Sequence, residues 1–383
     1  RSGAVGRKSL GSRPKRLVQN WLNGRSDGQL LSASVGNDPS LADVLKMVHP
    51  KPATPERAAF YAWLIGKPHD AALLPEAIKA LEQFRDDVAA PVPDVPFQLL
   101  TALPLRPQHW VAIACQAPWQ MTRMNLNTFA RHEVFKVGGM ARRIAERLRD
   151  PAAIRRARVF PYQLLSAYFM TSEGVPEVVR DALQDALEVA LENVPELPGQ
   201  IYVLLDVSGS MGSPVTGHRK GATSKVRCVD VAALVAAAIS AKNPATAILP
   251  FDTQVHAHRL NRRDSVLTNA QTLAQFGGGG TDCGLPLATL NQRKAAGDLV
   301  VYVSDNESWA DPQRGRGTET MRQWEAFRQR NPQARLVCID IQPYGTTQAQ
   351  TREDVLNVGG FSDAVFEVLA RFAAGQLGGE HWV

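Results

Sequence analysis

Residues 195–199 read PELPG, and two prolines and a glycine within five residues break any helix or strand. Before this segment, capping signals and apolar residues at helical spacing recur with no strand pattern between them. After it, β-branched apolar runs alternate with helical stretches, a pattern typical of a parallel sheet covered on both faces. We therefore predict two domains, residues 1–195 and residues 196–383.

The first domain is predicted to contain helices only. Ser40–Asp43 resembles a capping box that opens a helix ended by Pro50 and Pro52, and Thr54-Pro55-Glu56 is typical of a second helix start. Further helices are expected over about 76–88, 127–149 and 175–193. Helices that follow one another without strands indicate an α-helical repeat, a HEAT-like solenoid in which each pair buries its apolar face on the next.

The second domain is predicted to be a doubly wound α/β domain, which binds ligands beyond the carboxyl ends of its strands. Strands are expected at 201–206, 247–251, 299–304 and 336–341, with an edge strand near 255–260. Helices are expected at about 228–242, 264–276, 284–296, 318–330 and 361–374.

Three segments of this domain indicate a site for one divalent cation. Asp206, Ser208 and Ser210 follow the first strand at alternate positions, Thr281 follows four glycines, and Asp305 follows the strand at 299–304. Carboxylate and hydroxyl oxygens suit a hard cation, Mg²⁺ or Mn²⁺, better than zinc or copper. Ordinary capped loops are the alternative interpretation. No general base is placed by the motif, so we expect a binding protein and not an enzyme.

The basic charge lies in the first domain. Residues 1–195 hold 25 Lys and Arg against 19 Asp and Glu (25 − 19 = +6), whereas residues 196–383 hold 18 of each. Arg142, Arg143 and Arg147 lie on one predicted helix, where they could follow a chain of phosphates or form an ordinary solvated face.

Segments of this sequence resemble two known protein families. The three segments are similar to the metal-ion-dependent adhesion site of von Willebrand factor A domains, which implies that Asp206, Ser208, Ser210 and Thr281 bind the ion and that Asp305 acts through water. LADVLKMVHPKP at 41–52 and MTRMNLNTFARHEVF at 121–135 resemble the TROVE helical-repeat domain of the Ro autoantigen family, as do PYQLL at 161–165 and SDNES at 304–308. That family joins a TROVE domain to a C-terminal von Willebrand A domain.

The resemblance implies a bacterial Ro-like RNA-binding scaffold, N-terminally shortened because the family's ring needs more helical sequence before residue 41. It implies binding of small structured noncoding (Y-type) RNA and of misfolded or single-stranded RNA ends, in RNA quality control or processing beside a nuclease or ligase. His49 and Lys51 match a helix-end motif that faces RNA, although His49 could equally neutralise a helix C-terminus. A polar stretch near the inner surface of the ring is matched by Arg123, Asn125, Asn127 and His132.

The alternative is a metal-dependent protein-interaction module without RNA, related to adhesion proteins or chelatase subunits, in which the ion grips an acidic group of a partner. It leaves the charge asymmetry and the TROVE-like segments unexplained. The sequence has no long apolar run, and its four cysteines show no zinc spacing. We therefore expect a cytoplasmic protein with free thiols and no membrane contact.

Overall fold

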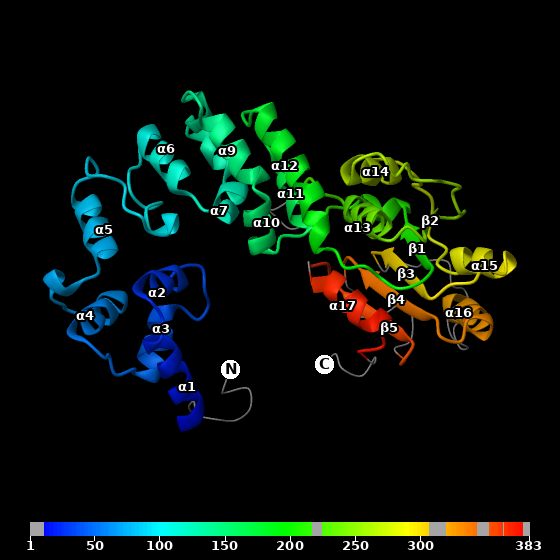
Figure 1. Ribbon diagram of the computed structural model, residues 1–383, viewed down its shortest axis with the longest axis horizontal. Coiled ribbons are helices and arrows are strands. Elements are labelled where there is room, and N and C mark those ends of the chain that lie inside the picture. Colours follow the sequence, from blue (N-terminus) through cyan, green and yellow to red (C-terminus); the bar gives the residue numbers. More distant parts are fainter. Residues whose placement is uncertain (1–10, 217–223, 306–318, 343–351, 363, 378–383) are drawn as a thin grey trace. The chain divides into compact units, whose positions relative to one another are not determined.

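The computed structural model describes residues 11–216, 224–305, 319–342, 352–362 and 364–377 (Figure 1). The chain divides into two compact units, residues 1–117 with 131–137, and residues 118–130 with 138–383. The helical region ends with η5 (Leu191–Asn193), and the first strand begins at Ile201. Because the compact units divide inside the helical region, a domain boundary at residue 195 stays a prediction.

The first unit is helical. Its elements are α1 (Ser12–Asn23), α2 (Asp27–Ala33), α3 (Leu41–Val48), α4 (Pro55–Leu64), η2 (Ala71–Leu73), α5 (Glu76–Asp86), η3 (Phe97–Leu99), α6 (Pro107–Gln116) and η4 (Val134–Lys136). The apolar faces of α1 to α5 share one core, which includes Leu22, Leu45, Phe60 and Ile78.

The two helix starts expected near residue 40 and residue 54 are confirmed. The Ser40 hydroxyl accepts the backbone N–H of Asp43 at 3.1 Å, and the Thr54 hydroxyl accepts that of Arg57 at 3.2 Å. These bonds satisfy amide groups that have no partner within the helix. The helix that begins after Ser40 ends at His49, which adopts the left-handed conformation at φ 48°.

Several helices of the second unit precede its sheet. They are α7 (Trp119–Met124), α9 (Met140–Arg149), α10 (Pro151–Ala157), α11 (Pro161–Met170) and α12 (Glu177–Ala190), while α8 (Leu126–Arg131) lies at the division between the units. The single helix expected over 127–149 is wrong. Glu133 (φ 63°) and Gly139 (φ 81°) take left-handed backbone conformations that a right-handed helix cannot contain, so α8 and α9 are separate.

The sheet has five parallel strands in the order β2-β1-β3-β4-β5. Four of them match the predicted strands to within one residue: β1 (Ile201–Asp206), β2 (Thr246–Phe251), β3 (Leu299–Ser304) and β4 (Arg335–Asp340). The fifth, β5 (Val355–Gly359), was not predicted. The edge strand expected near 255–260 is wrong, because only Val255 forms an isolated bridge, to Phe251, before the chain leaves the sheet.

Helices cover both faces of this sheet, as expected for a doubly wound domain. They are α13 (Cys228–Lys242), α14 (Val266–Leu273), α15 (Leu285–Gln292), α16 (Glu319–Arg330) and α17 (Ala364–Ala373). Leu204, Tyr302 and Cys338 pack with side chains of α15 and α16. Strand residues alternate between faces, so their neighbours point the other way, where α13 is buried from Cys228 to Ser240.

The last helical pair and the sheet domain belong to the same compact unit and are in direct contact. Phe160 stacks on Phe366 of α17 with ring centroids 5.7 Å apart, and Tyr162 meets Phe361 edge to face at 4.9 Å. On α12, Glu188 accepts the backbone N–H of Val266, the first residue of α14, at 2.8 Å. These contacts fix α11 and α12 against the sheet domain.

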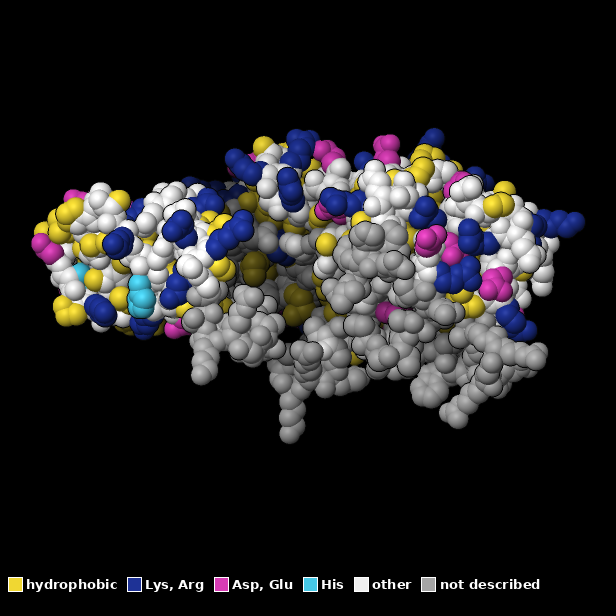
Figure 2. All heavy atoms as spheres, turned by 90° about the horizontal axis from the view of Figure 1, so that it is seen from below, with side chains coloured by type: hydrophobic (Ala, Val, Ile, Leu, Met, Phe, Trp, Pro, Cys, Tyr) yellow, Lys and Arg dark blue, Asp and Glu magenta, His cyan; other side chains and the backbone are white. Residues whose placement is uncertain are grey.

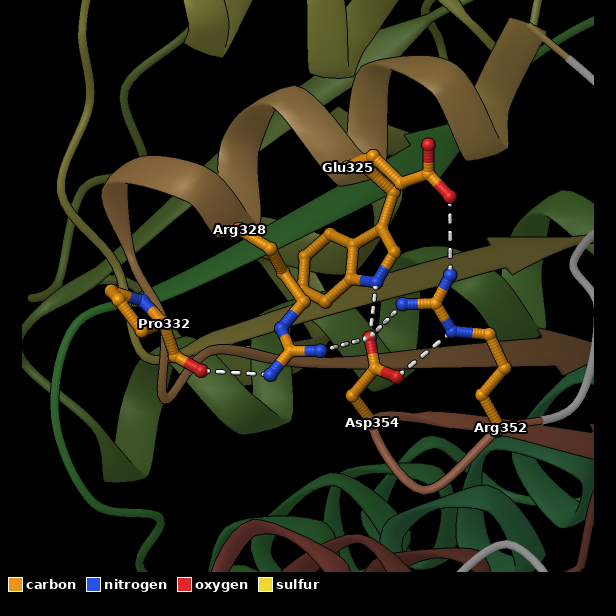
Figure 3. A network of polar contacts seen from close by, with 6 residues as sticks. Glu325, Arg328, Pro332, Arg352 and Asp354 are labelled. Atoms are coloured by element: carbon orange, nitrogen blue, oxygen red, sulfur yellow. Dashed lines mark hydrogen bonds and ion pairs between the residues drawn. The ribbon is translucent and has the colours of Figure 1, made fainter.

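A polar network joins α16 to the beginning of β5 (Figure 3). Asp354 accepts a hydrogen bond from the Trp324 indole N–H at 2.8 Å and lies 3.1 Å from a guanidinium nitrogen of Arg328. Arg352 pairs with the same carboxylate at 3.0 Å and with Glu325 at 3.2 Å. The network lies at the amino end of β5, at the edge of the parallel sheet opposite the predicted metal site.

None of the helices in the described ranges is long and apolar enough to span a membrane.

Candidate functional site

Asp206 ends β1 and is fully buried at the carboxyl edge of the sheet. Its Oδ1 accepts the backbone N–H of Ser208 at 2.9 Å, and its Oδ2 accepts the Ser304 hydroxyl of β3 at 2.7 Å. The hydroxyls of Ser208 and Ser210 lie 3.2 Å apart. The first predicted loop therefore presents a fixed carboxylate and two neighbouring hydroxyls at one place.

Ionising the Asp206 carboxylate in its buried position costs free energy. Burial raises its pKa to about 6, hydrogen bonds from Ser208 and Ser304 act in the opposite direction, and the nearby Asp305 carboxylate raises it further. Asp305, which is also buried, directly follows Ser304, and the Ser304 hydroxyl bonds to Asp206, so the third predicted segment lies beside the first. A bound cation would offset both the burial and the mutual repulsion of the two carboxylates.

The glycine-rich segment packs directly on the first loop. Gly278 donates its N–H to the Val207 carbonyl, and Gly209 donates to the Gly279 carbonyl, each at 2.9 Å. Gly277 has φ 83°, and a Cβ there would lie 2.0 Å from the Val207 carbonyl oxygen. Only glycine therefore permits this approach. Thr281, further along the segment, is buried with 3% of its surface exposed.

Residues outside the motif hold this second segment in place. Asp252, directly after β2, accepts the backbone N–H of Gly279 at 3.3 Å. The Tyr302 hydroxyl on β3 donates to the Cys283 carbonyl at 2.5 Å. The segment from 277 to 283 is therefore attached to strands on both sides of β1.

Sequence reasoning missed three polar side chains at this edge of the sheet: Ser304, Asp252 and Asp340. Asp340 ends β4 and pairs in register with Ser304; it is 2% exposed, and its Oδ1 has no hydrogen-bond partner among the described residues. Burial, with a contribution from Asp305, raises its pKa to about 7. All three lie at or just after a strand end, as Asp206 and Asp305 do, and this shared position is the signal that identifies them.

The donor set at this edge consists of oxygen atoms. Within the described ranges no group of three or more His, Cys, Asp or Glu side chains is arranged to hold a metal. The predicted set instead combines two carboxylates with three hydroxyls, which is chemistry suited to a hard cation with water ligands. The residues present therefore fit a magnesium-like ion. They offer no soft ligand for zinc or copper.

The predicted RNA-binding arginines lie on α9, in the second unit. Arg142 and Arg143 are exposed, and Arg156 and Arg158 of the following segment are exposed too. Arg147 is partly buried and donates to the hydroxyl of Thr122 at 3.0 Å. The helix therefore offers guanidiniums to solvent at 142 and 143, whereas position 147 ties α9 to α7.

The polar stretch around residue 125 makes bonds within its own unit. Arg123 donates to the Gln163 carbonyl at 2.9 Å, and the Asn125 amide donates to the Met121 carbonyl at 2.9 Å. The Asn127 amide donates to the Met170 carbonyl at 2.7 Å, and its oxygen accepts the Ser172 N–H at 2.8 Å. Arg123 and Asn127 thus connect α7 and α8 to α11, a role that the motif by itself does not reveal.

The remaining predicted residues belong to the first unit. His49 and Lys51 are exposed after the end of α3, and the Lys51 carbonyl accepts the Asn23 amide at 3.0 Å. His132 stacks on the Trp110 ring with centroids 4.4 Å apart, and burial lowers its pKa. On the face shown in Figure 2, basic side chains are scattered with acidic ones among them, and the described residues there form no single uninterrupted basic patch.

Parts of this chain are similar to known proteins. Residues 200–373 match the family model described as the Ro60 vWA domain. A curated relative from Deinococcus radiodurans, "RNA-binding protein RO60", is 28% identical over 362 residues, which are 88% of this chain and 66% of that protein. The chain is similar to Ro proteins over most of its length.

Further comparisons agree with a Ro-like chain. A Caenorhabditis elegans protein of the same description is 25% identical over 264 residues, 61% of this chain and 37% of that protein. The crystal structure of the Ro (RSR) protein of D. radiodurans superimposes with a TM-score of 0.73 at 24% identity, covering 98% of this chain and 79% of that one. This likeness confirms the predicted order of a helical region followed by a von Willebrand A-like domain. The chain spans less than two thirds of the length of either curated relative. Of the SDNES segment that contributed to the predicted resemblance, residues 304 and 305 belong to the described ranges and residues 306–308 lie outside them.

Proposed function

We propose that this Ro-like protein is an RNA-binding scaffold that holds small structured noncoding RNA of the Y type and single-stranded or misfolded RNA ends. The observation that carries the proposal is the group of exposed guanidiniums on α9 and after α10, in a domain order shared with relatives described as RNA-binding proteins. Guanidiniums bind phosphate oxygens through paired N–H donors. A scaffold of this kind would act beside an RNA-processing nuclease or ligase.

Within this proposal the predicted residues take two different roles. Arg142 and Arg143 contact phosphates directly, because their side chains face solvent. Arg123 and Asn127 act as positioning residues, because they already bond to the backbone of residues 163 and 170. His49 and Lys51 are available for contacts with phosphate or ribose on the first unit.

The test is a filter-binding titration of structured and single-stranded RNA at two salt concentrations. Arg142→Ala/Arg143→Ala should weaken binding and lower the slope of log K against log salt by about 0.7 to 0.9 for each phosphate that these arginines neutralise in the wild type. Arg293→Ala/Lys294→Ala removes the same charge from exposed positions after α15 and serves as the matched control. Equal RNA affinity in the two double variants would refute the assignment, and absent or salt-insensitive binding by the wild type would refute the function.

We also propose that Asp206, Ser208, Ser210, Thr281 and Asp305 hold one Mg²⁺ or Mn²⁺ ion, with Asp305 acting through water. The support is the burial of both carboxylates and the packing of the glycine segment on the Asp206 loop. Two carboxylates leave coordination positions for water or for a carboxylate or phosphate of a partner. The motif segments 206–210, 277–282 and 305 contain no His or Lys to act as a base, so we assign the centre a binding role and not a catalytic one.

Calorimetric titration with MgCl₂ tests this centre. Asp206→Asn should abolish uptake of the ion, while Asp264→Asn, at an exposed acid paired with Asn261 in the same domain, should not. RNA affinity should be unchanged in Asp206→Asn, because the proposed phosphate contacts lie on α9. A folded Asp206→Asn protein that binds Mg²⁺ normally would refute the metal centre, and one with reduced RNA affinity would place the ion in the RNA site.

A further inference from the structure

A hollow of about 580 Å³ lies beside the edge strand of the sheet, away from the predicted metal centre. Its wall includes the beginning of β2 at residues 246–248 and the segment 258–263, whereas Asp252 and the ion-binding loops lie past the other end of β2. The volume is within the range of small-ligand sites in proteins.

The hollow is lined by basic side chains and by no acidic one. Arg259, Arg262 and Arg263 all line it, all are exposed, and none forms an ion pair within the described part of the chain. Arg262 donates to the Pro244 carbonyl, which anchors one of the three guanidiniums against the turn before β2. The nearby Asp264 carboxylate accepts a bond from Asn261 at 2.9 Å and does not line the hollow. Three guanidiniums without a counter-ion attract an anion strongly.

Two polar atoms in the same wall form no hydrogen bond with any described residue. They are Thr246 Oγ1 and His258 Nε2, and both are shielded from solvent. The His258 ring is held edge to face against Phe276, with centroids 5.1 Å apart. Because neither atom has accessible surface, neither can bond directly to a molecule in the hollow, and the arginines are the groups that a ligand would meet.

We propose that this hollow binds a phosphate group, with Arg259, Arg262 and Arg263 pairing to its oxygens. The phosphate belongs either to an RNA chain or to a free nucleotide, because both carry the same group. The site lies on the half of the chain with equal numbers of basic and acidic residues, so net charge gave no indication of it. It is independent of the RNA contacts proposed for α9.

The experiment measures binding of three probes to the full chain: inorganic pyrophosphate and AMP by calorimetry, and a single-stranded RNA oligonucleotide by fluorescence polarisation. Arg259→Ala/Arg263→Ala should weaken at least one probe by about tenfold or more. The matched control is Arg293→Ala/Lys294→Ala, which should leave all three affinities at the wild-type level. Weaker binding of pyrophosphate and AMP identifies a free nucleotide as the source, and weaker binding of the oligonucleotide alone identifies RNA; either supports the site.

A second variant separates a built site from general attraction. Arg259→Lys/Arg263→Lys keeps every charge but removes the paired N–H donors of the two guanidiniums, and it should weaken the same probe several-fold. Unchanged binding by Arg259→Lys/Arg263→Lys would mean that surface charge alone attracts the probe, and the proposal would be wrong. It would also be wrong if no probe bound the wild type, or if the arginine variant matched its control. Because pyrophosphate and AMP do not require the α9 surface, this outcome is distinguishable from failure of the RNA-scaffold function.

Discussion

Replacing Gly277 by alanine should separate the glycine segment from the loop that follows β1. A Cβ at this position would lie 2.0 Å from the Val207 carbonyl oxygen, far inside contact distance, so the segment must move away. That same carbonyl accepts the Gly278 N–H at 2.9 Å, and the movement breaks this bond. The change therefore acts on the packing that brings Thr281 toward the Asp206 loop.

The magnitude follows from two contributions. A left-handed residue with a Cβ costs about 1 kcal/mol or more, and breaking one hydrogen bond costs about 1 kcal/mol. The sum, about 2 kcal/mol, corresponds to a fall of roughly 4 to 8 °C in Tm for a domain of this size. Any further backbone strain that remains after the segment has moved adds to this sum, which is therefore a lower bound.

The assay is thermal unfolding followed by circular dichroism, with and without MgCl₂. Gly280→Ala is the matched control in the same segment, because a Cβ there meets nothing nearer than Thr253 Cγ2 at 3.5 Å. We expect Gly280→Ala to unfold within about 1 °C of the wild type. We also expect Gly277→Ala to lose the stabilisation that Mg²⁺ gives. If Gly277→Ala were as stable as Gly280→Ala and took up Mg²⁺ equally well, the packing argument for the ion site would be refuted.

Three further predictions concern stability and reactivity. Burial alone would raise the pKa of Asp354, but a hydrogen bond from Trp324 and the ion pair with Arg352 outweigh burial and hold this pKa below its ordinary value. The contribution of Asp354 to stability is therefore present above about pH 4 and is lost as the pH falls through the lowered pKa. Urea unfolding from pH 7 to pH 3 should show a smaller acid-induced loss of stability in Asp354→Asn, and an unchanged pH profile would contradict this role. Ser40→Ala should lower the free energy of unfolding by about 1 kcal/mol through removal of the cap on α3, as measured in urea, whereas no change would mean that the cap is dispensable. Cys338 is fully buried with a raised pKa and Cys115 is partly exposed, so mass spectrometry after alkylation of the native protein should find Cys115 modified first; the reverse order would disagree with the structure.

The sequence predicted correctly those strands and helices that are determined by residues close together in the chain. Four strands were placed to within one residue, because each is a short apolar β-branched run bounded by polar or turn residues. The helix at 228–242 was placed with its observed ends, since Asp230 and Lys242 mark its first and last turns. In contrast, the strand Val355–Gly359 is short and carries Asn357 and Gly359, so its pairing with β4 has no local signal.

The residues of the candidate site likewise fall into those that a local motif identifies and those whose role depends on distant segments. The motif residues could be predicted because the Asp-x-Ser-x-Ser spacing, the glycine run and the Asp after β3 are visible in the sequence. Asp340 was missed because the predicted strand was extended one residue too far, to Ile341, which made the carboxylate an interior strand residue. The internal bonds of Arg123 and Asn127 depend on α11, about 40 residues further along the chain, and no local pattern identifies them.

By itself the sequence determined the order of a helical region and a parallel α/β domain, and it predicted an oxygen-rich site for a hard cation. Propensity, capping and side-chain chemistry are properties of neighbouring residues, so they can be read along the chain. Tertiary structure decided which of the polar residues face solvent and which are used internally, and it assembled the arginine-lined hollow beside β2. Burial and partnership arise only when distant segments pack together, and for that reason the hollow between residues 246–248 and 258–263 exists only in the folded protein.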